Sequence, residues 1–301
     1  MPRIAYVNGR YVPLRQPSIE VEDRGFQFAD SIYEVIVVSG GGLVDEEPHL
    51  DRMERSLREI HLAPAMSRRA LKLVMRQVLR RNCIGNGMLY LQVTRGAAPR
   101  NPAFPVGTQP SLIVTARRLA PLDPNALAEG VGVTALPDLR WKRCDIKSVA
   151  LLPNILAKQQ ALDAGFFDAW LVGEDGLITE GSASNAWIVT AQGDLLTRPA
   201  SSAVLRGVTR MTAIKLAGEL GLSFVERPFS LAEANSAREA FLTSASAYVL
   251  PVVRIDDVVI GEGRAGPLTM ALIKRYQAYM AKGAAAGKAR AVREAGNPHQ
   301  G

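Results

Sequence analysis

Apolar and polar positions in the first third of the chain follow the repeat of a strand in some segments and that of a helix in others. Alternating apolar residues on both sides of Asn8-Gly9, a typical two-residue turn, predict a β-hairpin over residues 3–12. Apolar residues three and four apart predict amphipathic helices over residues 50–60 and 67–81, and Ser67 suits the start of the second. Further strands are predicted over residues 30–38, 88–94 and 111–116.

The remaining chain shows the same two repeats without internal duplication. A strong helical period over residues 207–220 ends at Gly221, a favourable residue for terminating a helix. A second helix is predicted over residues 154–164, after a loop that extends to Ser148. Short apolar runs predict strands over residues 130–136, 168–172, 185–189, 194–197 and 239–243.

A break in this pattern divides the chain. Residues 119–125 include Pro121 and Pro124, which interrupt regular secondary structure, so we place a domain boundary there. We expect an N-terminal domain over residues 1–120, a linker over 121–125 and a C-terminal domain over 126–281. Residues 282–301 are rich in Ala, Gly, Lys and Arg, and we expect them to form a disordered tail.

Composition narrows the class of protein. A chain of 301 residues, 48% of them apolar, can bury the cores of two domains. No apolar run approaches the roughly 20 residues of a membrane-spanning helix, and the N-terminus lacks the apolar core of a signal peptide, so we expect a cytoplasmic protein. The cysteines and histidines have no spacing typical of a disulfide framework, a metal site or a catalytic triad, and no metal is expected: Cys83, Cys144, His49, His61 and His299.

The net charge of +7 raises the possibility of binding to nucleic acid. The positive charge is scattered, however. Residues 49–81 contain many arginines but also Asp51, Glu54 and Glu59, and no basic stripe is interleaved with aromatic residues. We interpret the arginines as solvated helix faces and expect no nucleic-acid partner.

Lys147 differs from the other lysines because it lies among aliphatic neighbours shortly after a predicted strand. Apolar surroundings disfavour the ammonium form of a lysine, and the neutral amine is a nucleophile that can form a Schiff base. A lysine in a loop is more often solvated or structural. Its position alone therefore leaves both interpretations open.

Two more segments have features of a cofactor site. Glu180 precedes glycine and small hydroxyl residues and leads into a predicted strand. It is either an exposed turn residue or a carboxylate that faces a ring nitrogen. Gly207 precedes a predicted helix whose first backbone N–H groups suit a phosphate, although a glycine before a helix is common.

Together with His49-Leu50-Asp51-Arg52, the order and spacing of these segments resemble the class IV (fold type IV) pyridoxal-phosphate-dependent enzymes. The resemblance runs over residues 6–279 and implies an α/β (α+β) fold of two domains, a small α/β domain and a larger pseudo-barrel domain. The segments most similar to D-amino acid aminotransferases in particular are residues 22–35, 93–96, 143–148 and 179–182.

The resemblance implies pyridoxal 5′-phosphate as cofactor and assigns residues to it. Lys147 would carry the cofactor covalently and move a proton between the substrate Cα and the cofactor. Glu180 would pair with the pyridine nitrogen, and Arg52 would bind the phosphate. The other implied cofactor contacts are Leu205 against the ring, and the backbone of Val208 and Thr209 with the loop of Ser244 and Ala245 at the phosphate.

For the substrate, the resemblance implies D-amino acids such as D-alanine and 2-oxo acids such as 2-oxoglutarate or pyruvate. Tyr33 and Arg100 would hold the substrate carboxylate. In the family this arginine comes from a loop of the partner subunit, which implies a homodimer with shared active sites. Three positions depart from the family: Pro102 replaces a histidine of the D-specific bacterial enzymes, and Ala183 and Ala245 stand where hydroxyl residues are common. These departures concern substrate range rather than cofactor chemistry.

Three alternatives remain. A branched-chain L-amino acid aminotransferase has the same fold and cofactor, but it should lack the Arg100 loop and have a Phe-Glu-Gly-type strand in place of Tyr33-Glu34-Val35. An aminodeoxychorismate lyase would release pyruvate instead of transferring the amino group. A basic nucleic-acid-binding protein is the non-enzymatic alternative, suggested by a pI near 9.6. A yellow colour of the purified protein would separate it from the enzymes.

Overall fold

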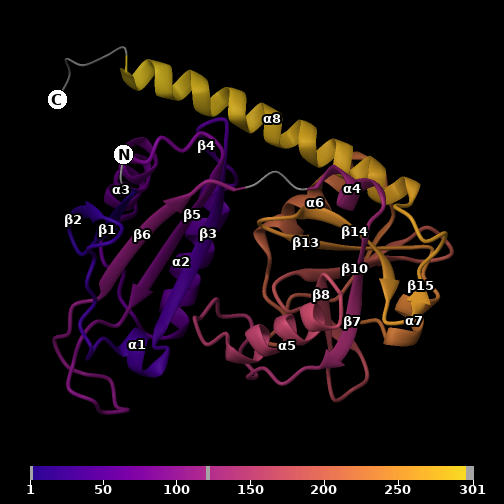
Figure 1. Cartoon of the computed structure of the whole chain (residues 1–301), viewed down its shortest axis with the longest axis horizontal. Helices are drawn as coiled ribbons and strands as arrows, with labels where there is room; N and C mark the ends of the chain where they lie inside the picture. Colours follow the sequence, from indigo (N-terminus) through magenta and orange to yellow (C-terminus); the bar gives the residue numbers. More distant parts are fainter. Residues whose placement is uncertain (1–2, 120–122, 296–301) are drawn as a thin grey trace. The chain divides into compact units, whose positions relative to one another are not determined.

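The computed structural model describes residues 3–119 and 123–295, which divide into two units (Figure 1). Unit 1 comprises Met1–Ala120, Ile146–Ala150 and the chain from Met280 onward, and unit 2 comprises Pro121–Asp145 and Leu151–Tyr279. The chain first passes from one unit to the other inside the proline-containing segment where we placed a boundary. The return of residues 146–150 to unit 1 was not anticipated.

Unit 1 contains a six-stranded antiparallel sheet with strand order β2-β1-β6-β5-β3-β4. The predicted hairpin is confirmed, since Val7 pairs with Arg10 and the turn residues Asn8 and Gly9 both have positive φ, as a two-residue hairpin requires. The strands are β1 (Ile4–Val7), β2 (Arg10–Pro13), β3 (Ser31–Ser39), β4 (Gly42–Leu43), β5 (Gly87–Thr94) and β6 (Ser111–Arg117).

The helices α2 (Glu46–Glu59) and α3 (Arg68–Arg81) supply one side of the unit 1 core, against the apolar face of the sheet. Both were predicted, and Ser67 caps α3 by accepting a hydrogen bond from the backbone of Ala70 at 3.3 Å. A short helix, α1 (Arg24–Phe28), precedes β3. The core includes Ile32, Ile36, Leu50, Leu57, Met75, Leu89 and Leu91, all fully buried.

Alternation along β3 and β5 gives the unit 1 sheet a second, half-exposed face. Tyr33 and Val35 alternate with the buried Ile32, Glu34 and Ile36 on β3. Because successive side chains of a strand point to opposite faces, the aromatic and polar residues gather opposite the core. The register pairs Tyr33 with Gln92 and Val35 with Tyr90, so these four residues share that face.

Unit 2 is built on a nine-stranded mixed sheet with strand order β12-β11-β10-β13-β14-β7-β8-β9, in which β15 pairs with β14. Most pairs are antiparallel, whereas β7 is parallel to both of its neighbours, β14 and β8. The strands are β7 (Val131–Pro137), β8 (Asp168–Val172), β9 (Ile178–Gly181), β10 (Asn185–Val189), β11 (Leu195–Thr197), β12 (Phe224–Glu226), β13 (Glu239–Ser244), β14 (Tyr248–Ile255) and β15 (Val258–Val259).

Large aromatic residues fill the interior of unit 2, where Trp187 stacks on Phe241 and Trp170 meets Phe229 edge-on. None of the helices in the described part of the chain combines the length and hydrophobicity needed to span a bilayer. The helices with residues in unit 2 are α4 (Pro124–Ala128), α5 (Leu152–Asp163), α6 (Val208–Glu219), α7 (Leu231–Asn235) and α8 (Pro267–Ala295), the last of which continues beyond the unit.

Two segments differ from the expectations. Helix α8 runs through residues 282–295, which we expected to be disordered, whereas residues 296–301 lie outside the described part. Ala, Lys and Arg favour helix strongly, so this composition extends a helix that has already begun. Pro124, which we expected only to interrupt structure, starts α4 at a position where its missing N–H costs nothing, and Asp123 caps the helix.

Candidate functional site

Lys147 is held in unit 1 by backbone pairing with the beginning of β3. The N–H of Tyr33 donates to the carbonyl of Lys147 at 3.0 Å, and the N–H of Val149 donates to the carbonyl of Ser31 at 3.1 Å. The Lys147 N–H donates to Ser56 Oγ at 3.3 Å, from helix α2. These bonds place the Lys147 Nζ 4.2 Å from the centre of the Tyr33 ring, an attractive cation–π geometry. The lysine is therefore fixed in place while its side chain stays half-exposed.

Tyr33 belongs to a small polar cluster on the same face of the unit 1 sheet. Its ring stacks on Tyr90, with ring centres 5.8 Å apart, and the Tyr90 hydroxyl donates to Gln92 at 2.8 Å. Burial, together with the neighbouring Tyr33, raises the pKa of Tyr90 to about 12, so this phenol is protonated at neutral pH. Sequence reasoning missed Tyr90 and Gln92, although period-two spacing on the strand beside β3 was a usable signal.

Arg52 is oriented by a buried carboxylate. Its guanidinium donates two hydrogen bonds to Glu34, each of 2.7 Å, in a bidentate pair. His49 Nδ1 lies 2.8 Å from the same carboxylate, and since a carboxylate only accepts, this nitrogen carries the proton. Burial alone would raise the pKa of Glu34, but Arg52 and His49 lower it to about 2. Burial lowers the pKa of His49, which we had expected to be incidental.

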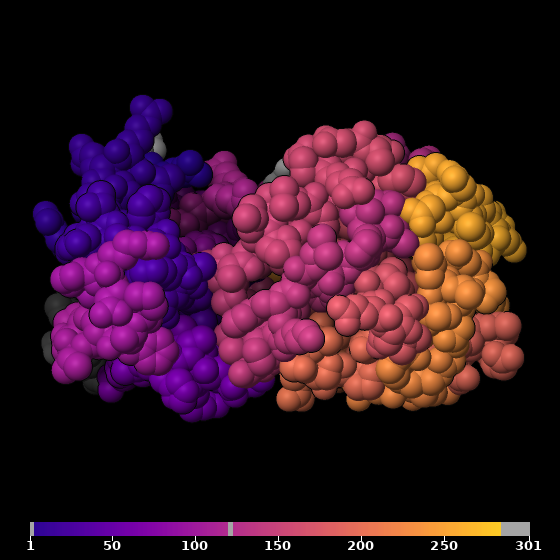
Figure 2. Space-filling view, turned by 90° about the horizontal axis from the view of Figure 1, so that it is seen from below, coloured from indigo at the N-terminus to yellow at the C-terminus, as the bar shows by residue number. Residues whose placement is uncertain are grey.

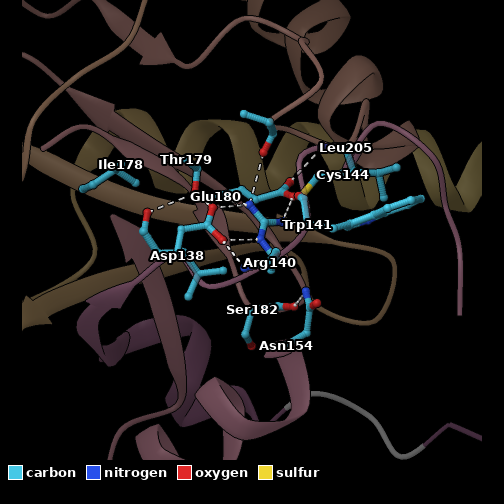
Figure 3. A network of polar contacts seen from close by, with 12 residues as sticks. Asp138, Arg140, Trp141, Cys144, Asn154, Ile178, Thr179, Glu180, Ser182 and Leu205 are labelled. Atoms are coloured by element: carbon cyan, nitrogen blue, oxygen red, sulfur yellow. Dashed lines mark hydrogen bonds and ion pairs between the residues drawn. The ribbon is translucent and has the colours of Figure 1, made fainter. Parts of the chain in front are cut away.

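Glu180 lies in strand β9 of unit 2 and is buried, so the exposed-turn interpretation is wrong (Figure 3). One carboxylate oxygen pairs with the guanidinium of Arg140. The other accepts from the side-chain amide of Asn185 at 2.9 Å and from the backbone N–H of Leu205 at 3.2 Å. All three partners are donors, an arrangement that suits an ionised carboxylate.

Arg140 links Glu180 to a second buried carboxylate, Asp138, as Figure 3 shows. The bonds from Arg140 to Asp138 measure 2.9 and 2.7 Å, and Thr179 donates to Asp138 at 2.7 Å. Burial would lower the pKa of Arg140, but the two carboxylates raise it; burial would raise the pKa of Asp138, but Arg140 and Thr179 lower it. All three groups therefore stay charged. Sequence reasoning missed Asp138 and Arg140, because nothing in a polar loop after a strand marks its charges as buried.

Asn185 connects Glu180 to the beginning of helix α6. Besides Glu180 it donates to the carbonyl of Leu205 at 3.0 Å. At Gly207, which caps α6, a Cβ would come within 2.1 Å of Asn185 Oδ1, so glycine is required there. The first amides of α6, those of Val208 and Thr209, have no acceptor within the helix, and no side chain caps them. Such a helix start suits an anion.

The turn after β13 begins beside this group. Asn185 pairs with Thr243 in the sheet, and Ser244 and Ala245 follow directly. Ser244 Oγ accepts a hydrogen bond from the N–H of Ala247 at 3.1 Å, which closes the turn. The predicted cofactor residues of unit 2 therefore lie around the two ends of β10 and β13 that meet at Asn185.

The described residues of unit 1 bring together Tyr33, Lys147 and, through Glu34, Arg52. Arg100 is not in contact with them there: it is exposed, and its guanidinium lies 4.6 Å from the centre of the Phe28 ring. In the described parts of both units, no group of three or more His, Cys, Asp or Glu residues has the arrangement of a metal site.

Comparison with known proteins agrees with these features. The family model described as amino-transferase class IV matches residues 31–255. A D-alanine aminotransferase from Bacillus licheniformis is 40% identical over 263 residues, covering 87% of this chain and 92% of that protein. One from Staphylococcus haemolyticus is 34% identical over 275 residues, covering 91% and 97%.

Solved structures of similar proteins give the same fold. A branched-chain amino acid aminotransferase from Escherichia coli superposes with a TM-score of 0.84 at 25% identity, covering 91% of this chain and 93% of that one. The T.th. branched-chain enzyme, solved with pyridoxamine 5′-phosphate, gives a TM-score of 0.86 at 24% identity over 93% and 94%. The predicted fold class and resemblance are confirmed, and the chain belongs to the class IV aminotransferases.

Proposed function

We propose that this protein is a pyridoxal-phosphate-dependent transaminase that transfers the amino group of a D-amino acid, such as D-alanine, to a 2-oxo acid, such as 2-oxoglutarate or pyruvate. The observation that carries this proposal is the 40% identity, over 87% of the chain, to a D-alanine aminotransferase. The amine of Lys147 over the phenol ring of Tyr33 supports it, because a reactive amine has to be held at a defined position. Donor and acceptor would react in turn at one site, a ping-pong mechanism.

The donors and acceptors of the chain fit pyridoxal phosphate. A buried carboxylate surrounded by donors, Glu180, suits a protonated pyridine nitrogen. The first amides of α6 and the guanidinium of Arg52 suit a phosphate. When bound, the cofactor supplies an electron sink for the substrate Cα. Leu205 would pack on the ring, and the Ser244–Ala245 turn would add phosphate contacts.

Two residues would handle the substrate directly. Lys147 would bind the cofactor and, once displaced by the amino donor, would hold and move the Cα proton. Tyr33, next to it, would donate a hydrogen bond to the substrate carboxylate. Arg100 would grip the same carboxylate with two parallel charge-assisted bonds, which a lysine cannot copy.

We propose that the enzyme acts as a homodimer in the cytoplasm and that Arg100 serves the site of the partner subunit. Helix α5 supports an assembly, because Leu152, Ile155 and Leu156 are 66%, 59% and 62% exposed (Figure 2). Apolar side chains grouped on one exposed helix are typical of a surface that another chain covers. The exposed position of Arg100 fits the same arrangement.

The branched-chain alternative rests on similarity of fold, at 25% and 24% identity to the two branched-chain enzymes. A donor screen separates the two functions. Purified holoenzyme should turn over D-alanine with 2-oxoglutarate or pyruvate faster than L-leucine. If L-leucine is the best donor, the proposed substrate class is wrong.

The cofactor assignment has its own experiment. Borohydride reduction of the holoenzyme followed by peptide mapping should locate the pyridoxyl group on Lys147. Lys142 lies five residues away in the same segment and serves as an internal comparison. A pyridoxyl group on Lys142 or Lys158 would overturn the assignment.

Subunit mixing tests the shared site. Arg100→Ala and Lys147→Ala proteins should each be inactive or nearly so, and mixed dimers should regain activity because one of their two sites contains both residues. Subunit exchange has to be verified by mass spectrometry. No recovery after proven exchange would mean that Arg100 acts within its own chain.

A further inference from the structure

The loop that carries Arg100 is closed tightly at its base. Residues 96–109 connect β5 to β6 at the surface of unit 1 (Figure 2). Gly96 has a φ of +89°, and a Cβ there would lie 2.0 Å from the carbonyl oxygen of Gln109, so the two ends of the loop touch where only glycine fits. Beyond this base, Phe104 and Val106 are exposed.

A buried arginine holds the loop at the residues that follow Arg100. Arg24, in helix α1, is only 3% exposed. One terminal nitrogen of its guanidinium donates to the carbonyl of Asn101 and the other to the carbonyl of Pro102, the second at 3.3 Å. Its Nε donates to Asp30 at 2.9 Å. The planar fork thus ties two successive loop carbonyls to the body of unit 1.

Asp30 anchors Arg24 and is itself held by a second arginine. Arg95 donates to both oxygens of Asp30, at 2.7 and 2.9 Å, and also to the carbonyls of Ile60 and His61. Its guanidinium lies 3.8 Å from the centre of the Phe104 ring, further along the loop. Burial would raise the pKa of Asp30, but the two arginines lower it, so the carboxylate stays charged between them.

Phe28 brings the guanidinium groups of Arg24 and Arg100 to one ring. They lie 4.9 and 4.6 Å from its centre, respectively. Arg100 is therefore restrained on both sides: its side chain rests on Phe28, and the backbone after it is tied to Arg24. A side chain ordered in advance loses less entropy when it binds a ligand.

We propose that Arg24 is a positioning residue for Arg100, acting through the carbonyls of Asn101 and Pro102. This inference rests on the proposed function, in which Arg100 binds the substrate carboxylate. It also explains how the loop accommodates Pro102. Proline has no N–H to donate, but its carbonyl accepts from Arg24 and its ring restricts the backbone.

Arg24→Lys tests the proposal, because lysine keeps the charge beside Asp30 but cannot bond both carbonyls and the carboxylate in one plane. We expect the KM for D-alanine to rise about 10-fold with kcat within about 2-fold, since a displaced Arg100 weakens carboxylate binding in the ground and transition states alike. In an Arg100→Ala background, the same change should alter kcat/KM by less than about 2-fold, as expected of residues that act as one unit.

Hydrogen exchange of the loop gives a readout that does not depend on activity. In holoenzyme without substrate, Arg24→Lys should speed exchange in peptides covering residues 99–106, while peptides of α2 and α3 stay unchanged. Phe28→Leu, at a half-exposed position, is a milder second variant and should raise the KM in the same direction. Arg76→Lys, at a partly buried pair with Glu46 in the same unit, is the matched control and should change neither quantity.

The outcomes separate this proposal from the proposed function. If the wild type does not transaminate D-alanine, the proposed function fails. If Arg100→Ala impairs D-alanine turnover but Arg24→Lys leaves both KM and loop exchange unchanged, the positioning role alone is wrong. If Arg24→Lys lowers activity as strongly in the Arg100→Ala background, Arg24 acts on the whole fold rather than through Arg100.

Discussion

Replacing Glu34 by glutamine keeps the shape of the buried side chain but removes its charge. The carboxylate is fully buried and is bonded by Arg52 and His49. After the change, the guanidinium of Arg52 would remain largely buried without the charge that compensates it. Uncompensated burial of a charge is strongly destabilising, so we expect Glu34→Gln to lower the free energy of unfolding.

The size and pH dependence follow from the pKa of Glu34. Lowering it from 4.5 to about 2 in the folded state corresponds to about 3 kcal/mol of stability when the group is ionised. Because the folded pKa is the lower one, this stability is fully present above pH 4.5 and is lost as the pH falls toward 2. Glutamine resembles the protonated form. The difference between wild type and variant should therefore be about 3 kcal/mol at pH 7 and about 1–2 kcal/mol at pH 3.

Urea unfolding of the apoenzyme at pH 7 and pH 3 measures this difference. Protein concentration has to be equal throughout, since bound cofactor and dimerisation both shift apparent stability, and sucrose can keep the protein folded at the lower pH. Glu47→Gln is the control, because Glu47 also pairs with cations but is exposed, and exposed pairs contribute little. A wild-type-to-variant difference that is the same at both pH values would refute the electrostatic explanation.

Three further changes probe the candidate site. Glu180→Ala should lower kcat about 100-fold, the scale of losing one strong electrostatic stabiliser, and near-normal steady-state turnover would exclude the role. Arg140→Leu leaves Glu180 and Asp138 buried without their cation, so urea unfolding should show a loss of about 3–5 kcal/mol; an unchanged midpoint would show that the pair contributes nothing. Pro102→His should raise kcat/KM for D-alanine about 10-fold or more if the histidine restores a hydrogen bond to the carboxylate, and unchanged kinetics would indicate that water or another residue already fills that place.

Local signals predicted most elements of the fold. The Asn8-Gly9 turn, the Ser67 cap and the Gly221 stop each depend on one or two residues and their neighbours, and the hairpin and the helices formed as expected. Strand β14 was missed because its apolar run contains Pro251, which argues against a strand. The end of α8 was missed because glycines within an alanine-rich segment suggested disorder.

The candidate site was predictable only where a motif marks it. Lys147 and Glu180 came from spacing and resemblance, and the structure adds the contacts around them. Arg140, Arg24 and Glu34 were not identified, because in a sequence a buried ion pair looks the same as two solvated charges. Their roles depend on partners far away in the chain, such as Arg24 with the carbonyls of Asn101 and Pro102, 77 and 78 residues later.

The pairing of residues 146–149 with β3 bears on the order in which the protein folds. Lys147 bonds to Ser56, 91 positions earlier, while the residues on either side of this short segment belong to unit 2. Contacts this distant close a large loop, which costs entropy and slows folding. During synthesis the strands of unit 1 emerge well before the segment that completes their edge. An N-terminal fragment ending at residue 120 would therefore lack the lysine altogether, and uptake of a coloured cofactor would follow completion of the chain rather than formation of the first sheet.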